Sequence, residues 1–407
     1  MTEKIKGNLI VGQSGGPTAV INSSLAGVIE EARKNSQIRE IYGMLHGIEG
    51  ALNENLIDLR KEEQSTIKGL TSTPSAALGS CRHKLSFEDY TKILSVLKAH
   101  DIRYFFYIGG NDSMDTSHKV SQISQKEGYE LRVIGIPKTI DNDLEVTDHC
   151  PGYGSVARWV AISTMEAGLD TDAIGIIDKV KVIEVMGRDT GWITAATTLG
   201  KRSDDDPPHL TYVPEIPFDQ DKFIEDVRRV YDRLGFCVIT ACEGLKDKDS
   251  NSLVESKRII DTDAFGHKQL GGVADYLCQL VSTRLNLKAR FDKPGTIQRV
   301  SMALASRVDL KEAYIVGQAA VREAIAGETD KMITLVRETS RTYRCTTGKV
   351  ELDKVANATK SLPRDFMNAD GNGTTATFRD YNMPLIGDPL PDYVKLNKIQ
   401  VPRKIGT

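Results

Sequence analysis

The sequence predicts an α/β protein with mostly parallel sheets, organised as two lobes. Short β-branched runs alternate with helical patterns along the chain, which is typical of βαβ units and parallel sheets. The length of 407 residues favours two lobes over a single core. A composition of 40% hydrophobic and 27% charged residues, without a low-complexity tract, is that of a folded enzyme-sized protein.

Three strands and one helix are expected in the first part of the chain. The segments 8–11, 104–108 and 133–136 are short apolar runs, as expected of buried strands. The segment 19–33 has the spacing of apolar residues found in helices. In parallel sheets ligands bind beyond the carboxyl ends of the strands, so the loops after these strands are where chemistry should lie.

The alternation continues in a second series of elements. The segments 181–185, 209–213 and 236–240 read as strands. Between them, the segment 221–234 reads as a helix, because Phe223, Val227, Val230, Tyr231 and Leu234 fall on one face of it. A second α/β lobe therefore follows the first.

The boundary between the lobes is expected at CPGYGS, residues 150–155, where the pattern breaks before a helix over 156–168. We therefore predict a first lobe over 1–155, completed by part of about 298–327, and a second lobe over 156–297. After Gly327 the pattern loosens and prolines accumulate, so residues 328–407 are expected to form an extension that packs on the body.

The composition argues against several classes of function. A formal net charge of -3 and a pI near 6.2 give no electrostatic footprint for nucleic acid or a membrane surface. No apolar stretch approaches the ~20 residues of a membrane span and no secretory leader is visible, so a cytoplasmic location is expected. The six cysteines form no CxxC pair, the seven histidines lack zinc spacing, and no GxxxxGK[ST] loop occurs.

Two glycine-rich loops follow predicted strands. GQSGGPT, residues 12–18, carries Gly15 and Gly16 between a strand and a helix, where backbone N–H groups can approach an anion. IGGNDSM, residues 108–114, follows Gly110 with Asn111 and Asp112, side chains that suit phosphate, hydrated Mg²⁺ or both. Taken alone, each loop is equally compatible with an ordinary turn or helix cap.

The loop PKTIDND, residues 137–143, carries the most specific signal. Lys138, Asp141 and Asp143 come directly after a buried strand, where charged groups are costly unless used. A carboxylate there can accept a proton from a substrate hydroxyl, and a lysine can neutralise charge on a phosphoryl group in transfer. The alternative is a turn rich in Asp and Asn.

Further candidate residues are scattered beyond this loop. EVMGRDTGW, residues 184–192, places Arg188 after a strand, and Glu243 follows another strand. A lone arginine is usually a solvated surface residue, so each further arginine is weak evidence for a site by itself. These candidates are Arg82, Arg290 and Arg299. The GxGxxA match at 152–157 follows a turn and not a strand, so we do not expect a dinucleotide site.

These loops, in this order, resemble those of the phosphofructokinase family over about the first three-quarters of the chain. The motifs are SGGP, LGSCR, GGND, PKTIDND, EVMGR, a strand-end CEG and GTIQR. The resemblance implies two doubly wound lobes with the active site between them. It makes 1–155 the phosphoryl-donor lobe and 156–297 the sugar-phosphate lobe of a glycolytic phosphotransferase.

The resemblance also implies roles for individual residues. Asp141 matches the general base for the C1 hydroxyl of fructose 6-phosphate, Asp143 its support, and Arg82 a cation near the transferred group. The positions that match sugar-phosphate contacts are Thr139, Ile140, Asp141, Met186, Gly187, Arg188, Glu243, Thr296 and Arg299. Arg290 matches a residue that reaches the 6-phosphate. Lys179 stands where an arginine often reaches the 6-phosphate from a neighbouring subunit, and the resemblance implies a homodimer or homotetramer.

The GGND and PKTIDND loops differ from the usual loops of the family, and these differences bear on the phosphoryl donor and on the metal ion. ATP-dependent members typically have GGDG and PGTIDND, so Asp112 here would repel the α-phosphate of ATP and Lys138 would serve pyrophosphate. The resemblance thus implies reversible transfer from pyrophosphate to fructose 6-phosphate. It also implies a Mg²⁺ cofactor near Asn111 and Asp112, although Asn111 stands where an aspartate is usual.

Two alternatives remain open from the sequence, an ATP-dependent phosphofructokinase and a catalytically silent metabolite-binding subunit. The sequence does not decide the direction of the reaction, allosteric effectors or the use of sedoheptulose 7-phosphate.

Overall fold

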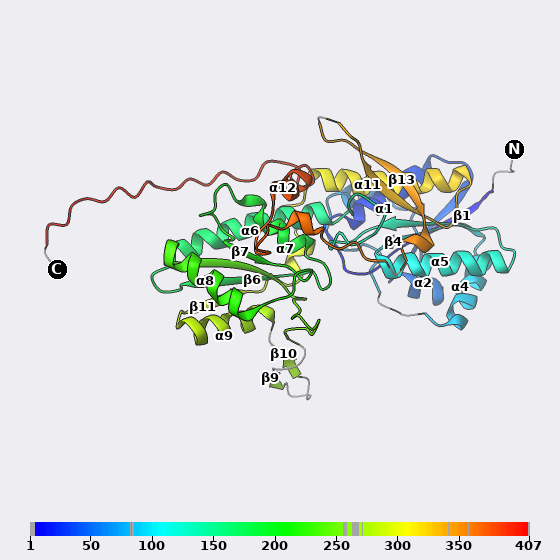
Figure 1. Ribbon diagram of the computed structural model, residues 1–407. Helices are drawn as coiled ribbons and strands as arrows, with labels where there is room; N and C mark the ends of the chain where they lie inside the picture. Colours follow the sequence, from blue (N-terminus) through cyan, green and yellow to red (C-terminus); the bar gives the residue numbers. More distant parts are fainter. Residues whose placement is uncertain are drawn as a thin grey trace.

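The computed structural model describes residues 5–81, 83, 85–254, 259–262, 268–270, 272–340, 342–356 and 358–405. Two α/β lobes lie side by side, and the last residues leave the body as an extended tail (Figure 1). The α/β class, the mostly parallel sheets and the two doubly wound lobes predicted from the sequence are confirmed. Among the described residues, no helix is long and apolar enough to cross a membrane.

The larger lobe is built on a seven-stranded sheet in the order β13-β12-β5-β4-β1-β2-β3. Its central strands are parallel, and only β3 and β13, at the two edges, run antiparallel to their neighbours. The strands are β1 Gly7–Gln13, β2 Ile38–Met44, β3 Leu56–Asp58, β4 Ile102–Gly109, β5 Arg132–Pro137, β12 Lys331–Arg337 and β13 Cys345–Glu351.

Helices cover both faces of this sheet because successive residues of a strand point to opposite sides. On β1, Leu9 and Val11 pack with the helices α1 and α11, whereas Ile10 packs with α2, α4 and α5. The helices of this lobe are α1 Ile21–Arg33, α2 Ile48–Leu52, α3 Gln64–Leu70, α4 Phe87–Ala99, α5 Asn111–Lys126 and α11 Arg307–Ala326.

The smaller lobe contains a parallel four-stranded sheet in the order β11-β6-β8-β7. Helices α6 and α7 pack on the face that carries Ile183, and α8 and α9 on the face that carries Val182. The elements are β6 Val180–Val185, β7 Leu210–Tyr212, β8 Cys237–Cys242, β11 Ala289–Asp292, α6 Tyr153–Ile174, α7 Trp192–Ala196, η1 Thr197–Gly200, α8 Gln220–Leu234, α9 Val273–Leu285 and α10 Ile297–Val300.

A two-stranded antiparallel ribbon, β9 Ile259–Thr262 and β10 Lys268–Leu270, projects from this lobe (Figure 1). The helix expected over 156–168 is longer than predicted, because α6 begins after the tight turn at Gly152, whose φ is 112°, and runs to Ile174.

The last eighty residues do not form one unit. Strands β12 and β13 complete the first sheet, whereas the later elements η2 Leu352–Lys354, η3 Arg364–Phe366 and α12 Ala376–Asn382 follow outside it. In α12, Phe378 packs in the core of the second lobe beside α6 and α7. This part of the chain therefore contacts both lobes.

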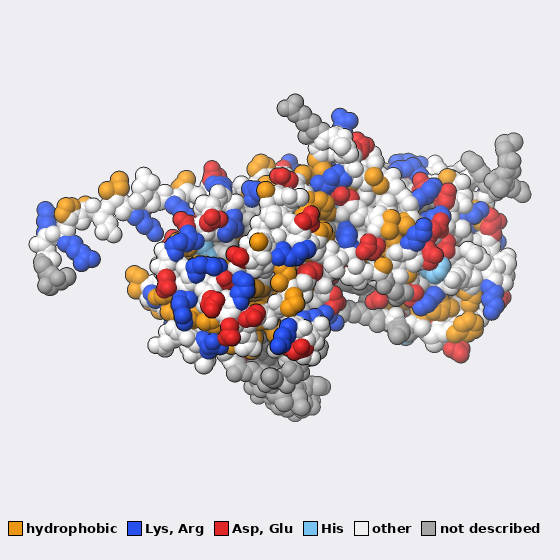
Figure 2. Space-filling view, in the orientation of Figure 1, with side chains coloured by type: hydrophobic (Ala, Val, Ile, Leu, Met, Phe, Trp, Pro, Cys, Tyr) orange, Lys and Arg blue, Asp and Glu red, His pale blue; other side chains and the backbone are white. Residues whose placement is uncertain are grey.

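Charged side chains of both signs are mixed on the face of the molecule shown in Figure 2. Basic and acidic side chains are interspersed over both lobes there. This mixture agrees with the small net charge of -3.

Candidate active site

The loop that follows β5 carries the central candidate residues. The backbone N–H of Lys138 donates to the carbonyl of Gly109 at 3.0 Å, so the ends of β4 and β5 stay paired where the loop begins. The N–H of Asp141 then donates to Oγ1 of Thr139 at 3.1 Å, and the Thr190 hydroxyl donates to the Asp141 carbonyl at 3.0 Å. Ile140, between Thr139 and Asp141 in the sequence, is buried. The sequence thus folds into a loop held from both lobes.

Asp141 lies in an environment that favours its protonated form. Burial raises the pKa of its carboxyl group to about 7, and the nearby carboxylates of Asp143 and Glu243 add to the shift. The positive charge of Lys138 lowers the pKa of Asp141 and so opposes these effects. A carboxyl group with a pKa near neutrality can accept a proton effectively at physiological pH, as a general base must.

The pKa of Asp143 is also raised, with burial as the main cause. Hydrogen bonding to Thr139 and the charges of Lys360 and Lys138 oppose this effect. Burial therefore raises the pKa of both carboxyl groups of this loop.

Lys138 reaches from this loop into the glycine loop after β1. Its side chain is 3% exposed, and Nζ donates to the carbonyl of Gly16 at 3.0 Å. Gly15 has a φ of +75°, and a Cβ built there would lie 3.0 Å from the same Nζ. A glycine at 15 therefore suits both the left-handed backbone and the approach of the ammonium group.

The GGND loop follows β4, the strand beside β5. A Cβ on Gly109 would lie 2.0 Å from Oγ of Ser113, so only glycine fits at this strand end. Gly110 caps helix α5, whose first two residues are Asn111 and Asp112. The Asp112 side chain is exposed, and within the described residues it forms no hydrogen bond or ion pair.

Two buried oxygen atoms between these loops lack a hydrogen-bond donor among the described residues. They are Oδ1 of Asn111 and Oδ1 of Asp143, and the amide of the same Asn111 lies 3.5 Å from Oδ2 of Asp143. Buried oxygens without donors are costly in themselves. Their carboxylate and amide chemistry is that of a Mg²⁺ site, so these residues fit the metal that the sequence predicts.

Candidate sugar-phosphate contacts gather at the carboxyl ends of β6 and β8. Met186, Gly187 and Arg188 follow β6 directly, and Glu243 follows β8 with its N–H bonded to the carbonyl of Val185 at 3.2 Å. Gly187 has a φ of +126°, which only glycine adopts easily, and this turn leads the chain to the exposed Arg188.

The GTIQR segment links the two lobes. Thr296 precedes the short helix α10 and is exposed. Gln298 is 2% exposed and accepts a hydrogen bond from the N–H of Met186 at 3.1 Å. Arg299 lies against the glycine loop, since a Cβ on Gly16 would be 2.9 Å from its Nη1. The carbonyl of Arg299 accepts from the N–H of Ala19 at 2.9 Å.

A cavity of about 450 Å³ opens between the glycine loop after β1, the segment 75–81 and Arg299. It is lined by Gly15, Gly16, Pro17, His46, Ser75, Ala76, Gly79, Ser80, Cys81 and Arg299. Backbone amides, hydroxyls and a guanidinium around one cavity suit an anionic ligand.

Two of the predicted residues lie elsewhere. Lys179 precedes β6, and Arg290 pairs in register with Lys181 near the same end of the sheet. Met186 follows the opposite end of β6, seven residues on from Lys179, or roughly 20 Å at the rise of a strand. One chain therefore does not bring Lys179 and Arg290 to the other candidate residues.

Exposed apolar side chains lie close in sequence to these two residues. Ile176, Ile177 and Phe291 are 89%, 64% and 45% exposed. Arg290 is held there by the buried carboxylate of Asp178, with Nε to Oδ2 at 2.7 Å. An ion pair of this kind fixes the guanidinium at the edge of the sheet.

Arg82 lies outside the described residues. Sequence reasoning missed several residues that shape the site, among them Ser80, whose hydroxyl donates to the carbonyl of Gly15 at 2.6 Å. It also missed Lys360, whose N–H donates to the carbonyl of Asp143 at 2.8 Å. Gln298 could have been found from its place in GTIQR, but no local signal marks Lys360.

Comparisons with known proteins agree with this geometry. The family model described as phosphofructokinase matches residues 8–324. Pyrophosphate–fructose 6-phosphate 1-phosphotransferase from Halomonas elongata is 44% identical, over 98% of this chain and 98% of its own length. Sulfofructose kinase from Alkalicoccus urumqiensis is 32% identical, over 87% and 90%. The crystal structure of a pyrophosphate-dependent phosphofructokinase from Marinobacter aquaeolei matches with a TM-score of 0.85 and 42% identity, over 99% of both chains.

Proposed function

The chain belongs to the phosphofructokinase family, and on this premise we propose that it transfers a phosphoryl group from pyrophosphate to the C1 hydroxyl of fructose 6-phosphate. The observation that carries the mechanism is the buried carboxyl group of Asp141, flanked by Asp143 and Lys138 at the carboxyl end of β5. The four relatives that are 41–44% identical over 98% of the chain all carry the pyrophosphate name.

In the proposed step the C1 oxygen forms a bond to one phosphorus of pyrophosphate. The bond from that phosphorus to the bridging oxygen breaks, and inorganic phosphate leaves. The hydroxyl proton passes to the carboxylate of Asp141, which must be ionised to accept it. Because the bond formed and the bond broken are both to phosphorus and no water is consumed, the same residues support the reverse direction.

Lys138 acts at the donor. Its buried ammonium lies at the glycine loop, where it would stabilise negative charge that develops on the transferred group and on the leaving phosphate. The ammonium group of a lysine is a compact point charge, so it can stabilise this negative charge without a nucleotide in the site.

Mg²⁺ is the proposed cofactor. Asn111, Asp112 and Asp143 would hold it, since the two buried oxygens without donors belong to the first and last of these. The ion would neutralise charge on pyrophosphate and orient it for attack.

We propose that Lys179 and Arg290 serve the 6-phosphate in the site of a neighbouring copy of the chain. Their distance from Met186 along β6 and the exposed apolar side chains close to them in sequence support a homodimer or a larger even-numbered assembly.

The test is a donor panel with purified protein, in which kcat/KM is measured for pyrophosphate and ATP in the presence of Mg²⁺. Pyrophosphate should be the preferred donor. In Asp112→Gly the ratio should shift toward ATP, because an exposed carboxylate that would repel an α-phosphate is removed. A wild-type preference for ATP, or an unchanged ratio in the variant, would contradict the proposal.

A further inference from the structure

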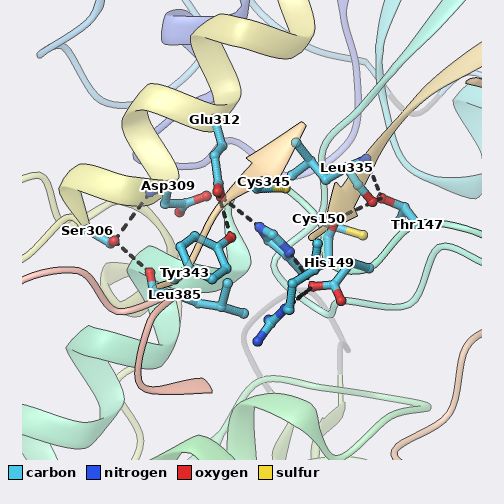
Figure 3. Close-up of polar contacts among 12 residues, drawn as sticks. Thr147, His149, Cys150, Ser306, Asp309, Glu312, Leu335, Tyr343, Cys345 and Leu385 are labelled. Carbon is cyan, nitrogen blue, oxygen red and sulfur yellow. Dashed lines mark hydrogen bonds and ion pairs between the residues drawn. The ribbon is translucent and has the colours of Figure 1, made fainter. Parts of the chain in front are cut away.

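We call residues 138–152, between β5 and α6, the catalytic loop. A buried charged cluster lies near the end of this loop, around His149 (Figure 3). The side chain of His149 is 1% exposed. Its Nδ1 lies 2.8 Å from Oδ1 of Asp148, and its Nε2 lies 2.7 Å from Oε2 of Glu312. The reaction proposed above uses none of these three residues.

The two carboxylates are held by other parts of the chain. The Tyr343 hydroxyl donates to Oε1 of Glu312 at 2.6 Å, and Nη2 of Arg337 donates to Oδ1 of Asp148 at 3.0 Å. Glu312 comes from α11, Arg337 ends β12, and Tyr343 precedes β13. Figure 3 shows His149 between Glu312 and the loop segment that carries Thr147 and Cys150. Residues from α11, β12 and the segment before β13 thus gather around the imidazole ring and the two carboxylates bonded to it.

The hydrogen bonding defines the charge of this ring. An ionised carboxylate only accepts, and neutral imidazole has a single N–H, so it can satisfy one carboxylate and would turn a lone pair toward the other. With both nitrogens protonated, His149 donates to Asp148 and to Glu312. The charges of His149 and Arg337 then balance those of the two carboxylates, as a buried cluster requires.

A metal site is the competing interpretation. His149, Glu312 and Cys345 offer ligand atoms within 4.8 Å of one another. An imidazolium has no free lone pair for a metal, however. Burial also raises the pKa of the Cys345 thiol to about 12, which keeps it neutral. The geometry therefore favours a proton over a metal ion.

We propose that His149, as an imidazolium, is a positioning residue that clamps the catalytic loop to α11 and to the β12–β13 hairpin and thereby fixes Asp141. The path to Asp141 is short. The N–H of Cys150 donates to Oδ1 of Asn142 at 3.0 Å, and the N–H of Thr139 donates to the carbonyl of Pro151 at 3.2 Å. Residues on both sides of Asp141 are thus bonded to the two residues after His149.

The clamp gains from protonation over a defined pH range. Burial lowers the pKa of His149, but the hydrogen bonds and charges of Asp148 and Glu312 outweigh this and raise it above its ordinary value. Its stabilising contribution is therefore complete below the unfolded value of about 6.5 and is lost as the pH rises through the folded value. The titratable and charged groups that face it are Asp148 and Lys360, Glu312 and Asp309 from α11, Arg337 from β12, Tyr343 and Cys345 beside β13, and Tyr381 from α12.

The first experiment measures the pH dependence of kcat/KM in His149→Gln. In the wild type the acid limb should reflect Asp141, whose pKa is about 7. A loosened loop admits water around Asp141, so the limb should move to lower pH by at least about half a unit while kcat falls about tenfold or more. A loss of folded protein alone would lower the rate without moving the limb, and that result would overturn the proposal.

His118→Gln is the matched control. His118 also contacts a carboxylate, with Nδ1 3.0 Å from Oδ1 of Asp330, but it lies on α5 and is 20% exposed. Its variant should keep the wild-type kcat and acid limb. A shift as large as that of His149→Gln would show that any histidine–carboxylate pair has this effect, and would overturn the assignment.

Two further measurements do not require activity, so they separate this inference from the proposed function on which it rests. In ¹⁵N-histidine spectra at pH 7.5, both ring nitrogens of His149 should be protonated, and Glu312→Gln should return the ring to a neutral form. Thermal unfolding should show that Glu312→Gln restores part of the stability lost in His149→Gln, because it removes the unpaired carboxylate. A neutral wild-type ring, or one equivalent of tightly held Zn²⁺ that Cys345→Ser releases, would overturn the proposal.

Discussion

Asp141 is held by a loop that its own chain pins at both ends, whereas Lys179 and Arg290 stand at the opposite end of the second sheet, close in sequence to exposed apolar side chains. The first region is buried and its carboxyl groups have raised pKa values. The second is open, and Arg290 is 57% exposed even while paired with Asp178.

The difference agrees with the roles that we propose for the two regions. A general base with a pKa near neutrality requires dry, fixed surroundings, which one chain supplies most reliably through short contacts. A cation that holds a substrate phosphate keeps its charge in water, so it can lie at an open edge that a second copy completes. The following variants test this contrast, from the largest expected effect to the smallest.

The largest effect is expected at Asp141, the buried carboxyl group that we propose as the base. Asp141→Ala should lower kcat by roughly 10²–10⁴-fold while binding of fructose 6-phosphate survives, because only proton removal is lost. Asp189→Ala is the control, since Asp189 is 64% exposed and is the smallest of the named contributors to the raised pKa. Turnover of Asp141→Ala close to that of the control would remove Asp141 from the chemistry.

The next effect is expected at the buried cation beside it. Lys138→Met keeps much of the side-chain volume but removes the charge that faces the donor, so kcat with pyrophosphate should fall roughly 10²–10³-fold. The pKa of Asp141 should rise further, because Lys138 lowers it in the wild type. Steady-state kinetics across pH would record both changes. An acid limb that moves downward would contradict the proposed electrostatics.

A smaller effect is expected at the cation that joins the lobes. Arg299→Met should raise the KM for fructose 6-phosphate and change kcat less. The expected loss of binding free energy is about 1.5–3 kcal/mol, the contribution of a hydrogen bond to a charged group. That range corresponds to about 10–150-fold. Arg307→Met is a suitable control, because Arg307 is 82% exposed and pairs with Asp388 at 3.0 Å. An unchanged KM in Arg299→Met would place this residue outside the sugar-phosphate site.

The sequence predicts which residues of the first region come together, because its signals are local. A lysine and two aspartates directly after a buried strand are costly without a use, and the strand order of a parallel sheet brings this loop beside the glycine loops. Lys138, Asp141, Asp143 and Asn111 lie together as expected.

The supports of that region could not be predicted in the same way. Lys360 and Glu312 contact the loop across more than 160 residues of sequence, and each looks locally like a surface residue. Only the packing of α11 and the C-terminal elements against the loop gives them their role. The same holds for strands β12 and β13, which lie in the segment expected to be an extension but pair with the first sheet.

The smallest effect tests whether the second region serves another copy of the chain. Two inactive variants would be combined, Asp141→Ala and the double variant Lys179→Ala/Arg290→Ala. If the edge acts on the partner's site, a mixed dimer has one site with both defects and one site with none.

Random mixing makes about half of the dimers mixed, so about a quarter of the wild-type activity should return when the two variants are refolded together and assayed at low fructose 6-phosphate. Either variant refolded alone is the control. If Lys179 and Arg290 acted within their own chain, each mixed dimer would keep one defect per site and no activity would return. The roughly 20 Å between Lys179 and Met186 along β6 is difficult to reconcile with that second outcome, because a lysine side chain cannot span it.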